Sequence, residues 1–272
     1  MTRAKRLFRY FSPKASDIFL DQKLWFSAAK DFNDIFEVAP RYDKLLTEQL
    51  ERRLKIEYAF LPPSVQTDWP TYRKAMAPFA RRLLEESFEI YPERCQRNFS
   101  ERFGIICFCE NADSLLMWGH YASCHKGFVV EFDPQHSMFS PNEFGKMEYS
   151  DTRPFIEERE YSKLLLTKSP EWSYEVEHRL IKPLSGLPIA TRRDGRELRF
   201  MHLPMEAVKA VYLGCRMPAE APDALREILN SLKSPPTQHI KPFLMRRHPA
   251  NYALVPVPWE EWKAPPPGAA VV

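Results

Sequence analysis

The hydrophobic pattern of the first forty residues predicts two short strands with a short helix between them. Residues 6–11 and 23–28 are apolar runs of strand length. Residues 12–23 begin with Ser-Pro, an N-cap residue followed by proline at the first helical position, which predicts a helix. Residues 30–37 place Asn and Asp between aromatic side chains, a composition typical of a turn.

The pattern changes over residues 42–98. Apolar side chains recur there at helical spacing among many charged ones. A proline-containing stretch, residues 61–70, divides the segment. We therefore predict two or three helices that form an insertion, laid on a sheet or used as a lid.

Beyond the insertion, strands and helices are predicted in alternation. Apolar runs predict strands, and capped segments with a helical period predict helices. Asp194-Gly195 between two alternating arms predicts a hairpin. The predicted strands are residues 103–110, 128–133, 146–150, 208–214, 239–247 and 252–257, and the predicted helices are residues 111–127, 155–167 and 220–233.

Residues 172–180, WSYEVEHRL, alternate as a half-exposed strand does. In a strand, Glu175, Glu177 and Arg179 share one face, and the two carboxylates lie about 7 Å apart. Such carboxylates repel each other, which can raise one pKa unless Arg179 or a substrate compensates. The pattern fits a solvated strand face or one wall of an active site.

Together these elements predict the fold class α+β. We expect a single domain over residues 1–262 with a mixed, mainly antiparallel sheet and a helical insertion at about 42–98. Residues 263–272, KAPPPGAAVV, predict a disordered tail.

The amino-acid composition argues against several classes of protein function. With 44% hydrophobic residues, the chain of 272 residues can bury a sizeable core, and its net charge of +3 does not by itself predict nucleic acid binding. The eight glycines form no phosphate-binding loop motif. Five cysteines without a CxxC pair argue against a disulfide framework or a zinc site, and favour a cytoplasmic protein. No signal peptide and no apolar run long enough to span a membrane is apparent.

Two stretches concentrate side chains that carry chemistry. In a helix, Trp118, Tyr121 and His125 would share one face, with His120 and Cys124 on the next. These histidines fit hydrogen bonding at a helix end, a hydrolase or nuclease site completed by Glu131, or a metal site. No third ligand is signalled nearby, and we expect no metal. Residues 24–37 fit an aromatic-anchored loop or a pocket wall with polar groups such as Asn33.

Four ordered blocks resemble the bacterial domain of unknown function 2971 family, whose members are often found in defence islands. The blocks are LFRYFS, LWFSAAKDFNDIFE, FCENADSLLMWGHYASCHKGFVVEFD and KSPEWSYEVEHR, within residues 7–182. The name of this family does not state a biochemical activity.

The order of elements is also similar, more distantly, to mono-ADP-ribosyltransferases. The resemblance implies a first-strand Arg9 or Tyr10 that anchors NAD, and Ser27 or Tyr121 shaping the nicotinamide pocket. It further implies Glu177 as the catalytic carboxylate, preceded by Glu175. The expected catalytic residues are Glu177, Glu175, Ser27 and Tyr121, and the expected cofactor-binding residues are Arg9, Tyr10, Trp25, Asn33, His120 and Arg179.

The leading hypothesis is an ADP-ribosyltransferase-like enzyme that uses NAD, a toxin or effector in bacterial defence. Its macromolecular acceptor would be a protein or a nucleic acid, and no membrane is involved. The alternative is a non-enzymatic module that binds a nucleotide or a partner protein, as in a toxin–antitoxin pair.

Overall fold

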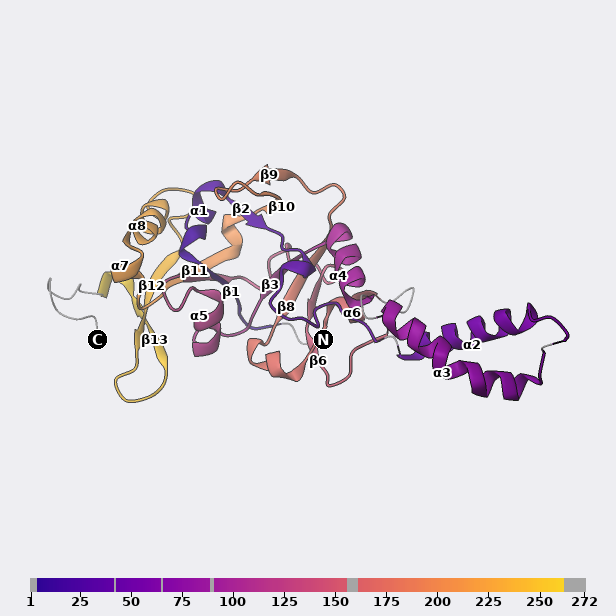
Figure 1. The fold of residues 1–272 in the computed structure, drawn as a ribbon. Coiled ribbons are helices and arrows are strands. Elements are labelled where there is room, and N and C mark those ends of the chain that lie inside the picture. The colour runs from indigo at the N-terminus through magenta and orange to yellow at the C-terminus, as the bar shows by residue number, and fades with distance from the viewer. Residues whose placement is uncertain (1–3, 42, 65, 89–90, 156–160, 262–272) are drawn as a thin grey trace. The chain divides into compact units, whose positions relative to one another are not determined.

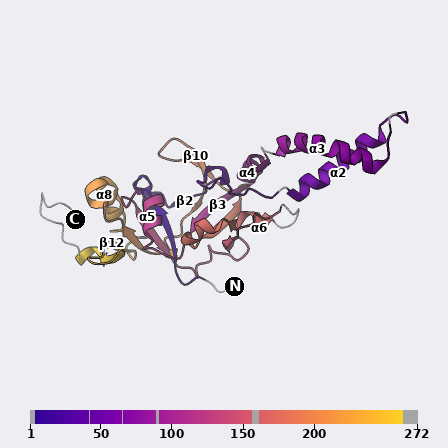
Figure 2. The same ribbon diagram turned by 60° about the horizontal axis from the view of Figure 1, so that its bottom comes forward.

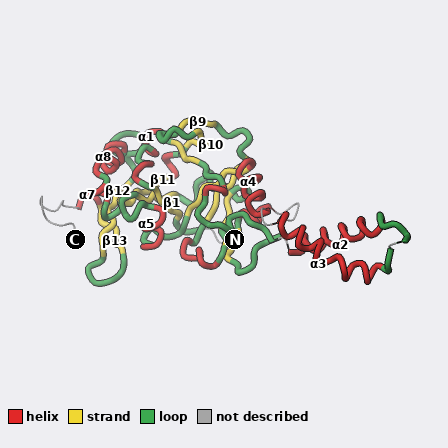
Figure 3. The backbone as a smooth tube through the Cα atoms, in the orientation of Figure 1, coloured by secondary structure: helices red, strands yellow, loops and turns green. Residues whose placement is uncertain are grey.

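A computed structural model describes residues 4–41, 43–64, 66–88, 91–155 and 161–261. Its helices, strands and loops confirm the α+β class (Figures 1 and 3). The chain forms two compact units. The first comprises residues 1–27, 103–147 and 171–272, and the second residues 28–102 and 148–170. The expected single domain stays a prediction, and the expected tail lies outside the described residues.

A five-stranded sheet organises the first unit. Its order is β1-β4-β11-β12-β13; β11 and β12 are parallel, and the other neighbours are antiparallel. This confirms a mixed, mainly antiparallel sheet. The strands are β1 (Leu7–Phe11), β4 (Phe128–Phe132), β11 (Val208–Leu213), β12 (Lys241–Arg247) and β13 (Leu254–Pro258).

Both faces of this sheet are buried, which explains the nearly continuous apolar run of β4. Phe128 and Val130 belong to one core cluster, which also holds side chains of α1 (Ile18–Asp21) and α8 (Pro222–Ser231). Val129 belongs to a second cluster, with Trp118 of α5 (Leu115–Tyr121). A short helix, α7 (Met217–Glu220), precedes α8.

Two three-stranded sheets complete the first unit. One has the order β3-β8-β5, and the other the order β2-β10-β9, both antiparallel. The turn between β9 and β10 confirms the hairpin predicted at Asp194-Gly195, with Gly195 at φ +85°. The strands are β3 (Phe103–Phe108), β8 (His178–Pro183), β5 (Phe144–Lys146), β2 (Lys23–Trp25), β10 (Glu197–His202) and β9 (Ile189–Thr191).

The second unit is mainly helical. Helices α2 (Asp43–Ala59) and α3 (Trp69–Phe88) pack side by side as a hairpin (Figure 2), and α4 (Tyr91–Arg102) follows. These three helices confirm the predicted helical segment. The unit also holds a parallel pair, β6 (Glu148–Tyr149) and β7 (Thr167–Lys168), and the helix α6 (Tyr161–Leu165).

The elements predicted over 111–127 and 172–180 were wrong in extent. The helix predicted over 111–127 covers only α5, which is capped by the Ser114 side chain accepting from the Met117 N–H. The strand predicted over 172–180 is a 3₁₀ helix, η3 (Pro170–Glu175), followed by β8. Val176 between them has φ +44°, a left-handed conformation that a β-branched residue rarely adopts.

Candidate active site

Strand β3 is the place where three distant segments of the first unit meet. β8 pairs with β3 from Phe103↔Pro183 to Phe108↔His178. Just past the end of β3, Cys109 joins β1: its N–H donates to the Phe8 carbonyl, and the Phe8 N–H donates back, both at 2.8 Å. Ser27, just past β2, exchanges two such bonds with Ile105, at 2.9 and 3.0 Å. The register therefore brings β1, the end of β2 and β8 to one strand.

An ionic cluster lies at this meeting point; it comprises the buried Glu177 and Arg179 and the half-buried Arg9 and Cys107. The Arg179 side chain is fully buried, and its Nε donates to Oε1 of Glu177 at 2.7 Å. One Nη of Arg179 donates to the other carboxylate oxygen at 3.3 Å. The Cys107 thiol lies within electrostatic reach of Glu177, and Arg9 Nη1 donates to the Cys107 carbonyl at 2.8 Å. Glu177 is only 4% exposed, so its carboxylate is held in one orientation.

Arg9 retains an unused donor in this cluster. Its Nε is buried and, among the described residues, has no hydrogen-bond partner. Burial lowers the pKa of Arg9, and the nearby Arg192 lowers it further, while the Cys107 thiol and the Glu177 carboxylate act in the opposite direction. A guanidinium stays protonated in proteins, so Arg9 offers a cation with a free N–H inside the protein. A buried unpaired donor is costly, and a ligand oxygen would remove that cost.

Cys107 is not a nucleophile in this arrangement. Burial, together with the adjacent Glu177 carboxylate, raises the pKa of its thiol well above the ordinary value. A thiolate is the reactive form, and a thiol with a raised pKa does not supply it.

Glu175 lies beside the ionic cluster and has a different partner. Its carboxylate accepts a hydrogen bond of 2.5 Å from the hydroxyl of Tyr121, which lies at the end of α5. Glu175 is 4% exposed. Both Glu175 and Glu177 add to burial in raising the pKa of Cys109 to about 12, so the two carboxylates lie near the same thiol. The left-handed Val176 between them replaces the strand geometry that would have aligned them on one face.

His178 extends the buried polar set on the other side of β3. Its Nε2 lies 2.8 Å from Oε1 of Glu110, to which Lys146 also donates at 2.7 Å. Burial lowers the pKa of His178 despite the Glu110 carboxylate. The pKa of Glu110 is lowered by these two partners. Because burial favours neutral His178, Lys146 is the charged partner of the Glu110 carboxylate.

Three left-handed residues form the turn after α5, and two glycines, Gly127 at its end and Gly214 after β11, lie close to neighbouring backbone. Ser123, Cys124 and His125 follow one another at φ +49°, +54° and +67°. A Cβ on Gly127 would lie 2.0 Å from the Phe11 carbonyl oxygen, and one on Gly214 would lie 2.1 Å from that of His125. The turn still stacks the His125 ring on the Trp118 ring, with 6.0 Å between the ring centroids and 5° between the ring planes. The predicted proximity of these two rings is therefore correct, although no helix produces it.

The other expected site residues lie outside the ionic cluster. Tyr10 points to the opposite face of β1, where its hydroxyl donates to the Asn111 carbonyl at 3.0 Å. Trp25 packs against Phe200 at 5.6 Å in the β2-β10-β9 sheet. His120 is exposed on α5, and Asn33 is exposed in the second unit.

Sequence reasoning missed Cys107 and the Glu110–His178 pair. The signal was present in the alternation of CFCE over residues 107–110, because side chains two apart in a strand share a face. Glu131, considered for a hydrolase site, is engaged by Arg6 Nε at 2.8 Å and by the Tyr212 hydroxyl at 2.7 Å. No group of three metal-binding side chains occurs among the residues that the structure describes.

Residues 117–180 match the model of a family described as "Protein of unknown function (DUF2971)". The matched segment contains Tyr121, Glu175, Glu177 and Arg179, and it supports the resemblance to that family over part of the last two sequence blocks, FCENADSLLMWGHYASCHKGFVVEFD and KSPEWSYEVEHR. No curated protein and no solved structure matches the chain, so the ADP-ribosyltransferase-like fold stays a prediction. Within the described part of the chain, no helix has the length and apolar character to cross a membrane.

Proposed function

We propose that the first unit binds NAD and breaks its nicotinamide–ribose bond, with Glu177 as the catalytic carboxylate, as an ADP-ribosyltransferase does. The observation that carries the proposal is the convergence of Arg9 and Glu177 on β3, with Ser27 paired to the same strand. These residues come from distant segments, in the order that the resemblance to mono-ADP-ribosyltransferases implies. A toxin or effector role in bacterial defence belongs to the same proposal and rests on the resemblances alone.

The chemistry needs a fixed anion near the ribose. When the bond between the ribose carbon and the nicotinamide nitrogen breaks, its electron pair leaves with nicotinamide, and positive charge develops on the ribose, as in glycoside cleavage. A carboxylate whose orientation is already set stabilises that charge without reorganising. The two hydrogen bonds from Arg179 set the orientation of Glu177 in this way.

The side chains around Glu177 are each assigned a role in the proposed reaction. Arg9, with its unused Nε–H, would bind the pyrophosphate of NAD through charge-assisted hydrogen bonds. Tyr121 would offer its ring to the nicotinamide, and Glu175 would take the proton of the acceptor as the acceptor attacks the ribose carbon. The acceptor would be a protein or a nucleic acid.

One observation favours a second candidate, a module that binds a nucleotide or an antitoxin-like protein without turnover. Glu177 is only 4% exposed and is hydrogen-bonded by Arg179, so a substrate must displace surrounding side chains to reach it. A non-enzymatic site would use the buried free donor of Arg9 and would not require contact with the Glu177 carboxylate.

The test measures NAD consumption by the purified protein in a cell lysate, with NAD labelled in its adenylate part. Removing the fixed charge by Glu177→Gln should lower turnover by about 10²–10³-fold, the size seen when one electrostatic stabiliser is lost. Glu197→Gln is the matched control, because Glu197 is exposed on β10. Circular dichroism verifies that both variants fold.

Three outcomes separate the candidates. Label transferred to a macromolecule by the wild type and the control, and lost in Glu177→Gln, supports the transferase. Unchanged turnover in Glu177→Gln refutes the role of this carboxylate. Calorimetric binding of NAD without consumption, weakened by Arg9→Gln, supports the second candidate.

A further inference from the structure

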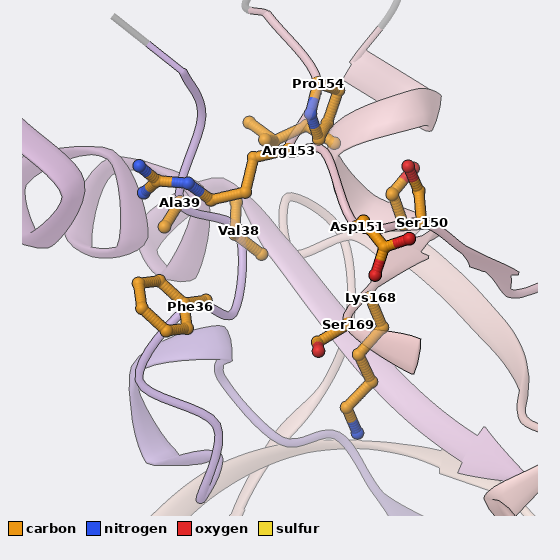
Figure 4. Close-up of a pocket in the computed structure, with 11 residues that line it drawn as sticks. Phe36, Val38, Ala39, Ser150, Asp151, Arg153, Pro154, Lys168 and Ser169 are labelled. Atoms are coloured by element: carbon orange, nitrogen blue, oxygen red, sulfur yellow. The ribbon is translucent and has the colours of Figure 1, made fainter. Parts of the chain in front are cut away.

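The second unit contains a pocket of about 190 Å³ that is independent of the proposed function (Figure 4). Its walls come from a turn at residues 36–39 and from the segments 150–154 and 164–169. An apolar cavity of about 150 Å³ is known to hold benzene, so this pocket has room for a small organic molecule. It is too small for a dinucleotide such as NAD.

The backbone around the pocket is tied together at several points. The Ser150 N–H donates to the Lys168 carbonyl at 3.0 Å, and the Arg41 N–H donates to the Pro154 carbonyl at 2.8 Å. On the opposite wall, Gln96 of α4 donates to the Glu37 carbonyl at 2.7 Å. These bonds make the pocket a preformed cavity in this unit.

Val38 indicates that the turn is held in an unfavourable conformation. It lies at φ +53° and is 1% exposed, and its side chain lines the pocket. A β-branched residue in the left-handed region is an outlier that persists only where its surroundings impose it, and such outliers cluster at ligand sites.

Two opposite charges line the pocket without neutralising each other. Asp151 and Arg153 are two residues apart, and neither has a hydrogen-bond or ion-pair partner among the described residues. The guanidinium of Arg153 instead lies 5.3 Å from the centre of the Phe36 ring. Figure 4 shows the Asp151 carboxylate and the Arg153 guanidinium on different sides of the pocket. Phe36 and Val38 supply the apolar wall.

We infer that this pocket binds a small amino carboxylate, a zwitterion of the free amino-acid class. Asp151 would accept from the ammonium group, Arg153 would donate to the carboxylate, and the apolar wall would contact the hydrocarbon part. A purely cationic ligand would meet the positive charges of Arg153 and Lys168, and a purely anionic one would meet Asp151. A molecule with both charges matches all three.

The inference is tested by calorimetric titration of the whole protein with the standard amino acids and with 4-aminobutyrate and 6-aminohexanoate. At least one should bind at about 10 mM or below, the range of a weak small-molecule site. Asp151→Asn and Arg153→Gln should each weaken its binding by about tenfold or more, because each removes a charge-assisted bond. Asp31→Asn and Arg94→Gln are matched controls, because both residues are exposed in the same unit.

Blocked forms of the best ligand test the two charges separately. The N-acetyl form lacks the ammonium and the amide form lacks the carboxylate, so both should lose binding. No binding by any member of the series overturns the inference. Equal binding of a blocked form, or equal loss in the two control variants, also overturns it. Thermal melts of the four variants verify that they fold.

Discussion

Replacing Arg179 with methionine tests whether the buried Arg179–Glu177 ion pair stabilises the first unit. The Arg179 side chain is fully buried and donates two hydrogen bonds, of 2.7 and 3.3 Å, to the Glu177 carboxylate. Methionine retains much of the aliphatic bulk but removes the charge and the donors. Glu177 then loses its nearest cation while it remains 4% exposed.

The expected loss follows from the cost of an uncompensated buried charge. Removing one partner of a buried ion pair destabilises by about 3–5 kcal/mol. Arg9 remains within electrostatic reach of Glu177, which places the loss near the lower end of that range, at about 3 kcal/mol. This corresponds to a roughly 150-fold larger population of locally opened molecules.

Hydrogen exchange measured by mass spectrometry reports this opening for peptides that cover β3 and β8, without requiring that both units unfold together. The double variant Glu177→Met/Arg179→Met should recover most of the protection, because apolar side chains replace a buried pair at little cost. Arg196→Met is the control: Arg196 pairs with Asp194 at 2.9 Å, but the side chains are 60% and 38% exposed. It should cost less than about 1 kcal/mol.

Exchange in Arg179→Met within about fivefold of the wild type, or about 1 kcal/mol, would refute the argument. It would mean that Glu177 does not depend on Arg179 inside the protein. A double variant as unstable as Arg179→Met would show instead that packing, not charge, is what the arginine provides.

Three further predictions follow from the same unit. Burial lowers the pKa of His178 below its ordinary 6.5, so the contribution of neutral His178 to stability should be complete above pH 6.5 and should be lost as the pH falls below it. The difference between the urea unfolding midpoints at about pH 7.5 and pH 5.5 should therefore be smaller in His178→Gln than in the wild type. Gly127→Ala should destabilise by more than about 2 kcal/mol in urea unfolding through backbone overlap, whereas Gly119→Ala, with open space around its Cβ, should stabilise α5 by about 0.5–1 kcal/mol; equal effects would contradict this. Tyr121→Phe removes a hydrogen bond to the buried Glu175 and should cost about 1–3 kcal/mol in the same assay, and a neutral result would deny that contact.

Much of the secondary structure could be predicted from the sequence because it depends on local chemistry. The apolar run at 128–132 predicted β4, since a strand buried on both faces needs apolar side chains throughout. Asp194-Gly195 predicted its hairpin, since Gly195 tolerates the left-handed conformation of the turn. The helical spacing over 42–98 likewise predicted α2, α3 and α4.

In the 172–180 segment, the local sequence pattern does not predict the structure. Its alternation predicted one strand with Glu175 and Glu177 on a common face, but a left-handed Val176 divides it. The carboxylates then reach different partners, Tyr121 from α5 and Arg179 within β8. Both carboxylates are buried, so the interpretation of a solvated face is wrong. Nothing in the nine residues encodes these contacts, because the Tyr121 hydroxyl lies 54 positions from Glu175.

The sequence by itself determined which residue types could form a charged site and the order in which they occur along the chain. The tertiary structure decided which of them meet: pairing with β3 brings Arg9 to Glu177 and Ser27 to the same strand, while Tyr10 faces the other side of β1. It also decided that the charges are buried and that Arg9 keeps a free donor. The reason is physical: periodicity reports the face on which a side chain lies, whereas burial and partners depend on strands that come from elsewhere in the chain.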